Sequence, residues 1–162
     1  MTLSYQIVNK DCFLAVGLPW EGTFAEADAG AIRGVLKELH QRVEEIGYKL
    51  SCEEVIGLSY RVMTDSEKFR HYSLIEVEKV THIPNGMVAV QVPAMSLVKA
   101  THKKGNEVAS SYQELYQWME QQGHTAADEE YTHMEIYPLD SSTYEGDPEF
   151  TMFIPIKESV KS

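Results

Sequence analysis

Cysteine, basic clusters and long apolar runs are all scarce in this sequence of 162 residues. Cys12 and Cys52 stand alone, without the paired spacing of a disulfide framework or a zinc site, which predicts reduced thiols. No run of Lys and Arg exceeds the pair Lys103-Lys104, and 25 acidic against 14 basic residues give a formal net charge of −11. Such a field repels phosphate backbones and anionic lipid and attracts cations, so we expect no direct nucleic-acid binding and no membrane association.

Targeting segments and catalytic motifs are also lacking. The N-terminal stretch "MTLSYQIVNKDCFLAVGL" has neither a basic leader nor an apolar run of membrane-spanning length, which predicts a cytoplasmic protein. No Gly-x-Ser-x-Gly, His-Glu-x-x-His, phosphate loop or nicotinamide fingerprint occurs, so no cofactor is expected. We expect no metal site, because metal-ligand spacings are missing among the six histidines: His40, His71, His82, His102, His124 and His133.

The composition is that of one globular domain, which we predict to span residues 1–162, since 43% of the residues are hydrophobic and 24% are charged. Apolar residues recur at helical spacing in two segments. The first shows Ile32, Val35, Leu36, Leu39, Val43 and Ile46; the second shows Val108, Tyr112, Leu115, Tyr116 and Met119. A capping box, Thr23 with Glu26, precedes the first helix, and Gly47 and Gly123 are predicted to end the two helices in left-handed conformation.

The two halves of the chain share one order of elements. Each helix is preceded by an extended apolar segment, "CFLAVGLPW" or "GMVAVQVPAMSLVKA", and followed by two strand-like segments. The followers are "EEVIGLSYRV" and "HYSLIEVEKV" in the first half, and "YTHMEIYPL" and "EFTMFIPI" in the second. This pattern predicts a duplicated βαββ unit, with repeats at about 1–80 and about 86–160 joined through "HIPNG". Residues 140–149 are predicted to form a polar loop.

We therefore expect an α+β fold in which the two units form one curved antiparallel sheet. Both helices would cover its convex face and leave an open concave face as a ligand cleft. Because neighbouring strand residues point to opposite faces, Met134 and Ile136 would face the helices, and Glu135 and Tyr137 the cleft. The same alternation in "EFTMFIPI" assigns Phe153 to the side of Glu135. A strand Glu can instead be a solvent-facing or salt-bridged residue, and periodicity alone does not choose between these interpretations.

Several stretches resemble one known family. They are "EKFRHYSLIEVEKVTHIPNGMVAVQVPAMSLVKATHKKG", "SYQELYQWMEQQGH", "THMEIYP" and "FTMFIPI". In their order and spacing they are similar to the gyrase-inhibitor-like (GyrI-like) effector-binding domain, which also forms the ligand-binding half of AraC-type and multidrug-sensing MerR-type regulators. The resemblance covers essentially the whole chain. Since no helix-turn-helix segment accompanies the domain, we expect a stand-alone member.

The resemblance implies a role for Glu135. In multidrug-sensing members an acidic residue on the matching strand engages lipophilic cations among aromatic rings, and a poorly solvated carboxylate gains from such a partner. The other predicted ligand-binding residues are aromatic: Tyr137, Phe153, Tyr60, Tyr72, Trp118 and Trp20. Tyr60 and Tyr72 could also be core residues, Trp118 could close the core at the sheet margin, and Trp20 could pack in a loop.

Three functions follow as hypotheses. The first is binding of a hydrophobic, cationic or amphipathic small molecule, for ligand sensing passed to a separate regulator protein or for sequestration of a toxic compound. The second, implied by family members described as hydrolases of cyclopropane-containing compounds, makes Glu135 a general base. The third is a protein-interaction module that presents an acidic face to a partner such as gyrase; its binding would depend steeply on salt.

Overall fold

The structure is a computed structural model that describes residues 5–50, 53–61, 68–127, 131–140 and 149–157. It has an α+β fold in which the helices pack against one antiparallel sheet. The strands are β1 (Tyr5–Lys10), β2 (Phe13–Thr23), β3 (Glu54–Arg61), β4 (Lys68–Val77), β5 (Val88–Val92), β6 (Met95–His102), β7 (Tyr131–Pro138) and β8 (Phe150–Pro155). The helices are α1 (Phe24–Asp28), α2 (Ala31–Arg42), a 3-10 turn (Val43–Glu45) and α3 (Val108–Gln121).

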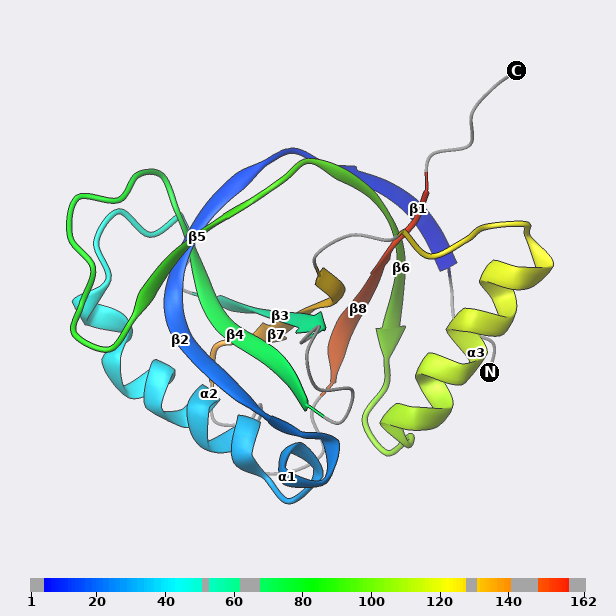
Figure 1. Cartoon of the computed structure of the whole chain (residues 1–162), viewed down its shortest axis with the longest axis horizontal. Coiled ribbons are helices and arrows are strands. Elements are labelled where there is room, and N and C mark those ends of the chain that lie inside the picture. The colour runs from blue at the N-terminus through cyan, green and yellow to red at the C-terminus, as the bar shows by residue number, and fades with distance from the viewer. Residues whose placement is uncertain (1–4, 51–52, 62–67, 128–130, 141–148, 158–162) are drawn as a thin grey trace.

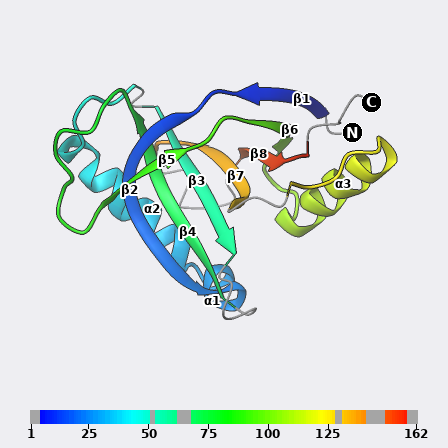
Figure 2. The ribbon, with the colours of Figure 1, turned by 45° about the horizontal axis from the view of Figure 1, so that its top comes forward.

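The two halves of the chain exchange their first strands. The sheet order is β1-β6-β8-β7-β3-β4-β2-β5, so β1 pairs with β6 of the second half and β5 pairs with β2 of the first. Figures 1 and 2 show β1 running across to the half of the molecule that carries β6, β8 and α3. Two strands precede the helix in each half, so the predicted βαββ unit is corrected to ββαββ. The ranges predicted for the two repeats remain a proposal.

The helix ends differ partly from the prediction. The capping box is present, since Thr23 Oγ1 accepts from Glu26 N at 3.1 Å and Glu26 Oε1 accepts from Thr23 N at 2.9 Å, but it caps the short helix α1. The left-handed glycine at Gly123 is confirmed, with φ of 79°. Gly47 was predicted wrongly, because the positive φ falls one residue later, at Tyr48, where φ is 57°. The predicted loop 140–149 lies largely outside the described residues, which omit 141–148.

The sheet curves, with α2 and α3 on its outer side (Figure 1). Between the helices and the sheet lies an apolar cluster that we call the helix-side core; it includes Leu36, Leu39, Val55, Leu115, Tyr137 and Met152. A second cluster, the inner core, fills the other face of the sheet and includes Ile56, Leu58, Leu74, Leu97, Met134 and Phe153. Both faces of the sheet are therefore packed, and the inner face is a core where the prediction placed an open cleft.

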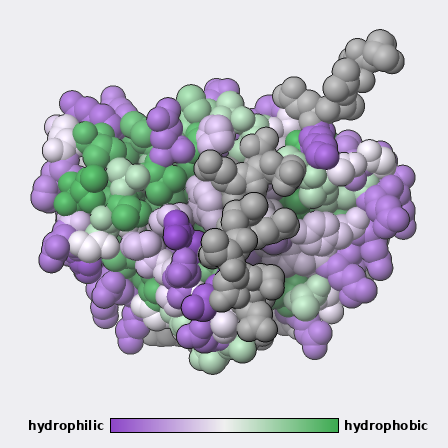
Figure 3. All heavy atoms as spheres, viewed as in Figure 1, coloured by the Kyte–Doolittle hydropathy of each residue, from purple (hydrophilic) through white to green (hydrophobic). Residues whose placement is uncertain are grey.

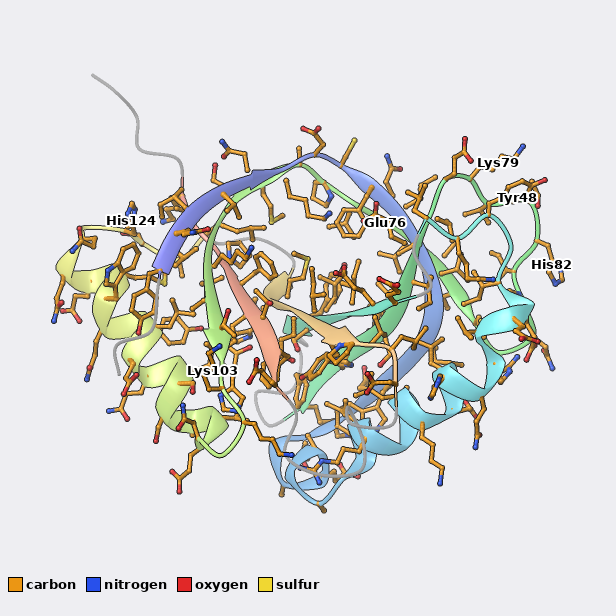
Figure 4. All side chains as sticks on the ribbon, turned by 180° about the vertical axis from the view of Figure 1, so that it is seen from behind. Tyr48, Glu76, Lys79, His82, Lys103 and His124 are labelled. Carbon is orange, nitrogen blue, oxygen red and sulfur yellow. The ribbon has the colours of Figure 1, made fainter. Side chains whose placement is uncertain are left out.

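Charge and apolar residues are unevenly distributed over the surface. Figure 3 shows hydrophobic residues gathered on the half of its face that carries β2 and β5, while the half that carries α3 is mainly hydrophilic. At the outer margin of the sheet, Lys79 Nζ lies 4.4 Å from the centre of the Tyr48 ring (Figure 4).

None of the helices in the described ranges combines the length and the apolar character that crossing a membrane requires.

Candidate functional site

Glu135, in the middle of β7, is the acid around which a candidate site is built. Tyr112, in the first half of α3, donates its hydroxyl to Glu135 Oε2 at 2.5 Å. Tyr137, two residues along β7 and on the same face, donates to Oε1 at 2.8 Å. One oxygen is thus bonded from the helix and the other from the strand, so the carboxyl group is held in a defined orientation between α3 and the sheet.

Among the acids that the structure describes, Glu135 is the one whose pKa is raised. Burial raises the pKa of its carboxyl group, and the hydrogen bonds from Tyr112 and Tyr137 act against that shift. Burial and the nearby Glu135 charge raise the pKa of both phenols, so they remain donors at neutral pH. Arg33 of α2 opposes this shift at Tyr137 only. Among the described residues no Lys, Arg or His forms an ion pair with Glu135, so its partners are neutral.

A histidine borders the carboxyl group on β7. His133 shares the face of Glu135 by strand alternation, and its ring meets the Tyr112 ring edge-on, with centroids 5.1 Å apart. The Tyr116 hydroxyl lies 2.9 Å from Nε2, and Thr132 Oγ1 lies 2.9 Å from Nδ1. Because burial lowers the pKa of His133 to about 4, this imidazole is neutral at physiological pH and brings no positive charge to the site.

The site lies on the face of the sheet opposite to the one predicted. Alternation correctly grouped Glu135 with Tyr137 and Met134 with Ile136. The choice of face was wrong, because Met134 and Ile136 pack in the inner core, whereas Tyr137 packs in the helix-side core and Glu135 contacts α3. A cleft on the concave face containing Glu135 is therefore excluded. The position between the sheet and the helices replaces it.

Three predicted aromatic residues lie on the other face from Glu135. Phe153 is directly opposite Met134 in the β7–β8 register and belongs to the inner core, so its predicted side is wrong. Tyr60 and Tyr72 meet edge-on, with ring centroids 5.2 Å apart, and pack against the same inner core. The face on which a strand residue lies depends on how its strand pairs with its neighbours, and the sequence of a single strand does not reveal that register.

The two tryptophans lie at opposite ends of the helix side. Trp20 on β2 is directly opposite His71 on β4 and meets the Phe69 ring at a centroid distance of 5.3 Å. It shares the face of Glu135, three strands away. Trp118 stacks on Tyr5 at 5.0 Å and packs against the helix-side core at the sheet margin. Ligand-binding roles for Glu135, Tyr137, Trp20 and Trp118 remain predictions.

Sequence reasoning missed Tyr112 as a site residue, because it counted the residue only in the apolar stripe of its helix. A signal was present. A tyrosine that lies within an apolar stripe buries its ring and must find a partner for its hydroxyl, so it points to a polar group on the facing strand. Glu135 is that group.

Removing the Tyr112 hydroxyl tests this assignment. In Tyr112→Phe the carboxylate keeps one of its two donors, so we expect the pKa of Glu135 to rise and the free energy of unfolding at neutral pH to fall by about 1 kcal/mol. Carboxyl carbon NMR and chemical denaturation measure the two effects. Tyr116→Phe is the matched control, because its hydroxyl bonds to His133. An unchanged Glu135 titration in Tyr112→Phe would contradict the assignment.

The described residues offer nothing that resembles a metal centre. Within these ranges no three His, Cys, Asp or Glu side chains come together in a way that could hold a metal ion. One carboxyl group, two phenols and a neutral imidazole come together in the site, a set that suits charge recognition, hydrogen bonding and proton transfer.

Comparison with known proteins extends these observations. The transcriptional regulator BrlR from Pseudomonas aeruginosa is 29% identical over 112 residues; the matched part covers 68% of this chain and only 40% of BrlR. The structure of SAV2435 bound to tetraphenylphosphonium superposes with a TM-score of 0.70 at 13% identity, covering 95% of this chain and 94% of that one. A hydrolase from Listeria innocua gives a TM-score of 0.57 at 12% identity, covering 94% and 91%.

Because their sequence identities are low, the two structural likenesses establish the fold alone. A match to a family model also establishes membership of that family, because it covers residues 3–157, nearly the full length of the sequence. That family is described as the GyrI-like small molecule binding domain, and its match agrees with the resemblance noted in the sequence. The chain therefore belongs to the GyrI-like small molecule binding domain family.

Proposed function

We propose that this chain binds hydrophobic or amphipathic cations between its sheet and helices, with Glu135 as the charge-reading group. Its role would be ligand sensing linked to transcription regulation, or sequestration of a toxic compound. The observation that carries the proposal is a half-buried carboxyl group held by two neutral phenols, with no cationic partner among the described residues.

The energetics of such a carboxylate favour a cationic ligand. Burial makes its charge costly, and the phenol hydrogen bonds offset only part of that cost, since the pKa remains raised. A bound cation supplies the missing opposite charge in surroundings where the attraction is poorly screened. The net charge of −11 favours the approach of cations as well.

Aromatic rings around Glu135 would add affinity for the apolar part of the ligand. Tyr112 and Tyr137 present ring surface beside the carboxyl group that they bond, and His133 lies against Tyr112. A cation over an aromatic face gains about 0.5–2 kcal/mol per favourable contact. Binding of tetraphenylphosphonium by SAV2435, which shares this fold, supports the ligand class.

Calorimetric titration with tetraphenylphosphonium, and with triphenylphosphine oxide as a neutral comparison, tests the proposal. We expect Glu135→Gln to weaken cation binding by at least about tenfold, or about 1.4 kcal/mol, and to leave the neutral compound unaffected. Glu114→Gln is the matched control, because it removes the same charge from the exposed surface of α3. Equal cation affinity in Glu135→Gln and the wild type would contradict the proposal.

The same carboxyl group supports a second candidate, general-base hydrolysis of strained electrophiles. Its raised pKa makes it a stronger base than an ordinary carboxylate, and the likeness to the Listeria innocua hydrolase shows that the fold is shared. Both oxygens already accept phenol hydrogen bonds, however, so an attacking water would have to displace one of them. We therefore rank binding above hydrolysis. Turnover of a cyclopropane-containing compound by the wild type, absent in Glu135→Gln, would reverse this order.

A further inference from the structure

Two buried polar atoms on β4 have no hydrogen-bond partner among the described residues. They are Nδ1 of His71, whose residue is 2% exposed, and Oγ of Ser73, whose residue is 0% exposed. The two residues are separated by one position, so both side chains project from the same face of the strand. This face is the helix side, because Ser73 lies directly opposite Leu18, a member of the helix-side core.

The strand register places these residues in the same row across the sheet as the acid. Glu135 on β7 lies directly opposite Gly57 on β3, and Gly57 lies directly opposite Ser73 on β4. Gly57 has no side chain, and the His71 ring occupies the space that one would take: Nε2 is 2.8 Å from the position of a Cβ at Gly57. Tyr137 approaches the same position to 3.6 Å. The imidazole therefore lies in the row between Ser73 and Glu135.

A second buried histidine shows what a purely structural arrangement looks like in this fold. His102 on β6 is 1% exposed, and its Nδ1 lies 2.7 Å from the hydroxyl of Ser111 on α3, which is also buried. That histidine and serine satisfy each other. His71 and Ser73 do not, although they are as deeply buried, and an unmade hydrogen bond in the interior costs stability unless a bound molecule supplies it.

We propose that His71 and Ser73 form a hydrogen-bonding part of the Glu135 site, and that its ligand is an amine or quaternary ammonium compound carrying a hydroxyl or amide group. Neighbouring positions in a row are about 5 Å apart, and Ser73 lies two positions from Glu135, so a group bonded between His71 and Ser73 would lie roughly 5–10 Å from the positive charge. A neutral imidazole and a hydroxyl can each donate and accept, which matches a group able to do both. The inference rests on the proposed function, because Glu135 anchors the charge.

Two probes of equal size separate the contributions: benzyldimethyl(3-hydroxypropyl)ammonium and benzyldimethyl(butyl)ammonium, which differ by a hydroxyl in place of a methyl group. By calorimetry we expect the wild type to bind the hydroxyl probe about tenfold more tightly. Ser73→Ala and His71→Phe should each reduce the ratio below about threefold. Ser96→Ala is the control, because its hydroxyl bonds to Asn9, away from the site.

The outcomes distinguish the inference from the function on which it rests. If both probes bind equally and depend on Glu135, the hydrogen-bonding part is wrong and the proposed function stands. If the preference for hydroxyl persists in Ser73→Ala and His71→Phe, the assignment to these residues is overturned. If neither probe nor tetraphenylphosphonium binds, both proposals fall. Thermal unfolding of each variant shows whether it is folded, and Ser73→Ala decides the matter if His71→Phe does not fold.

Discussion

Gly17→Ala is expected to lower the free energy of unfolding by at least about 3 kcal/mol, a loss large enough to prevent stable folding. Gly17 lies within β2, which is hydrogen-bonded on both sides, to β4 and to β5. A Cβ at this position would lie 1.8 Å from the carbonyl oxygen of Ser73 and 2.8 Å from Leu74 Cα. These are backbone atoms of the neighbouring strand, so no change of rotamer can relieve the overlap.

Gly34→Ala is a matched control in the same chain. Gly34 lies at the end of the first turn of α2, is exposed, and has nothing within 4 Å of the position that a methyl group would take there. Alanine is favoured over glycine in a helix interior by about 1 kcal/mol, so this variant should be more stable than the wild type. Chemical denaturation measures both changes. A Gly17→Ala protein with wild-type stability would show that β2 and β4 are not packed as closely as described.

Local sequence patterns predicted most elements of the fold and grouped the residues of β7 correctly. Alternation identified β3, β4, β7 and β8, and helical spacing identified α2 and α3. The exchanged strands β1 and β5 were missed or merged. Both lie at edges of the sheet and pair with the opposite half of the chain, so what defines them is a contact distant in sequence.

The sequence predicted the central residue of the candidate site but not most of the residues around it. Glu135 stood out because a carboxylate between two apolar residues needs an explanation, and the family resemblance supplied one. Phe153 was assigned to the wrong face because the register between β7 and β8 cannot be read from the sequence. The pairing of Met134 with Phe153 shows that Phe153 lies on the face opposite to Glu135. His71 was considered only as a metal ligand. Its importance follows from the missing side chain of Gly57, a contact that no spacing in the sequence reveals.

The second large effect that we expect is a loss of folding stability at acidic pH, caused by His71. His71 is 2% exposed, and burial lowers its pKa from 6.5 to about 4, so its neutral form is the one that the folded state stabilises. Between these two values the unfolded chain binds more protons than the folded protein. The contribution of His71 to stability is therefore fully present above pH 6.5 and is lost as the pH falls towards 4, by about 3 kcal/mol in total.

Glu135 acts in the opposite direction over the acidic range. Its pKa is raised in the folded state, so its contribution to stability is fully present below the unfolded value and is lost as the pH rises through the folded value. The two effects must be separated by substitution. In His71→Phe we expect the loss of stability between pH 7 and pH 4 to be smaller than in the wild type by about 3 kcal/mol.

Denaturant unfolding at a series of pH values measures this difference. His82→Gln is the matched control, because it replaces an exposed histidine in the connection between the two halves. If wild type and His71→Phe lose stability in parallel on acidification, His71 is protonated in the folded protein at ordinary acidity. Its imidazole would then carry a positive charge beside Glu135 below neutral pH, and the preference of the site for cations would decline as the pH falls.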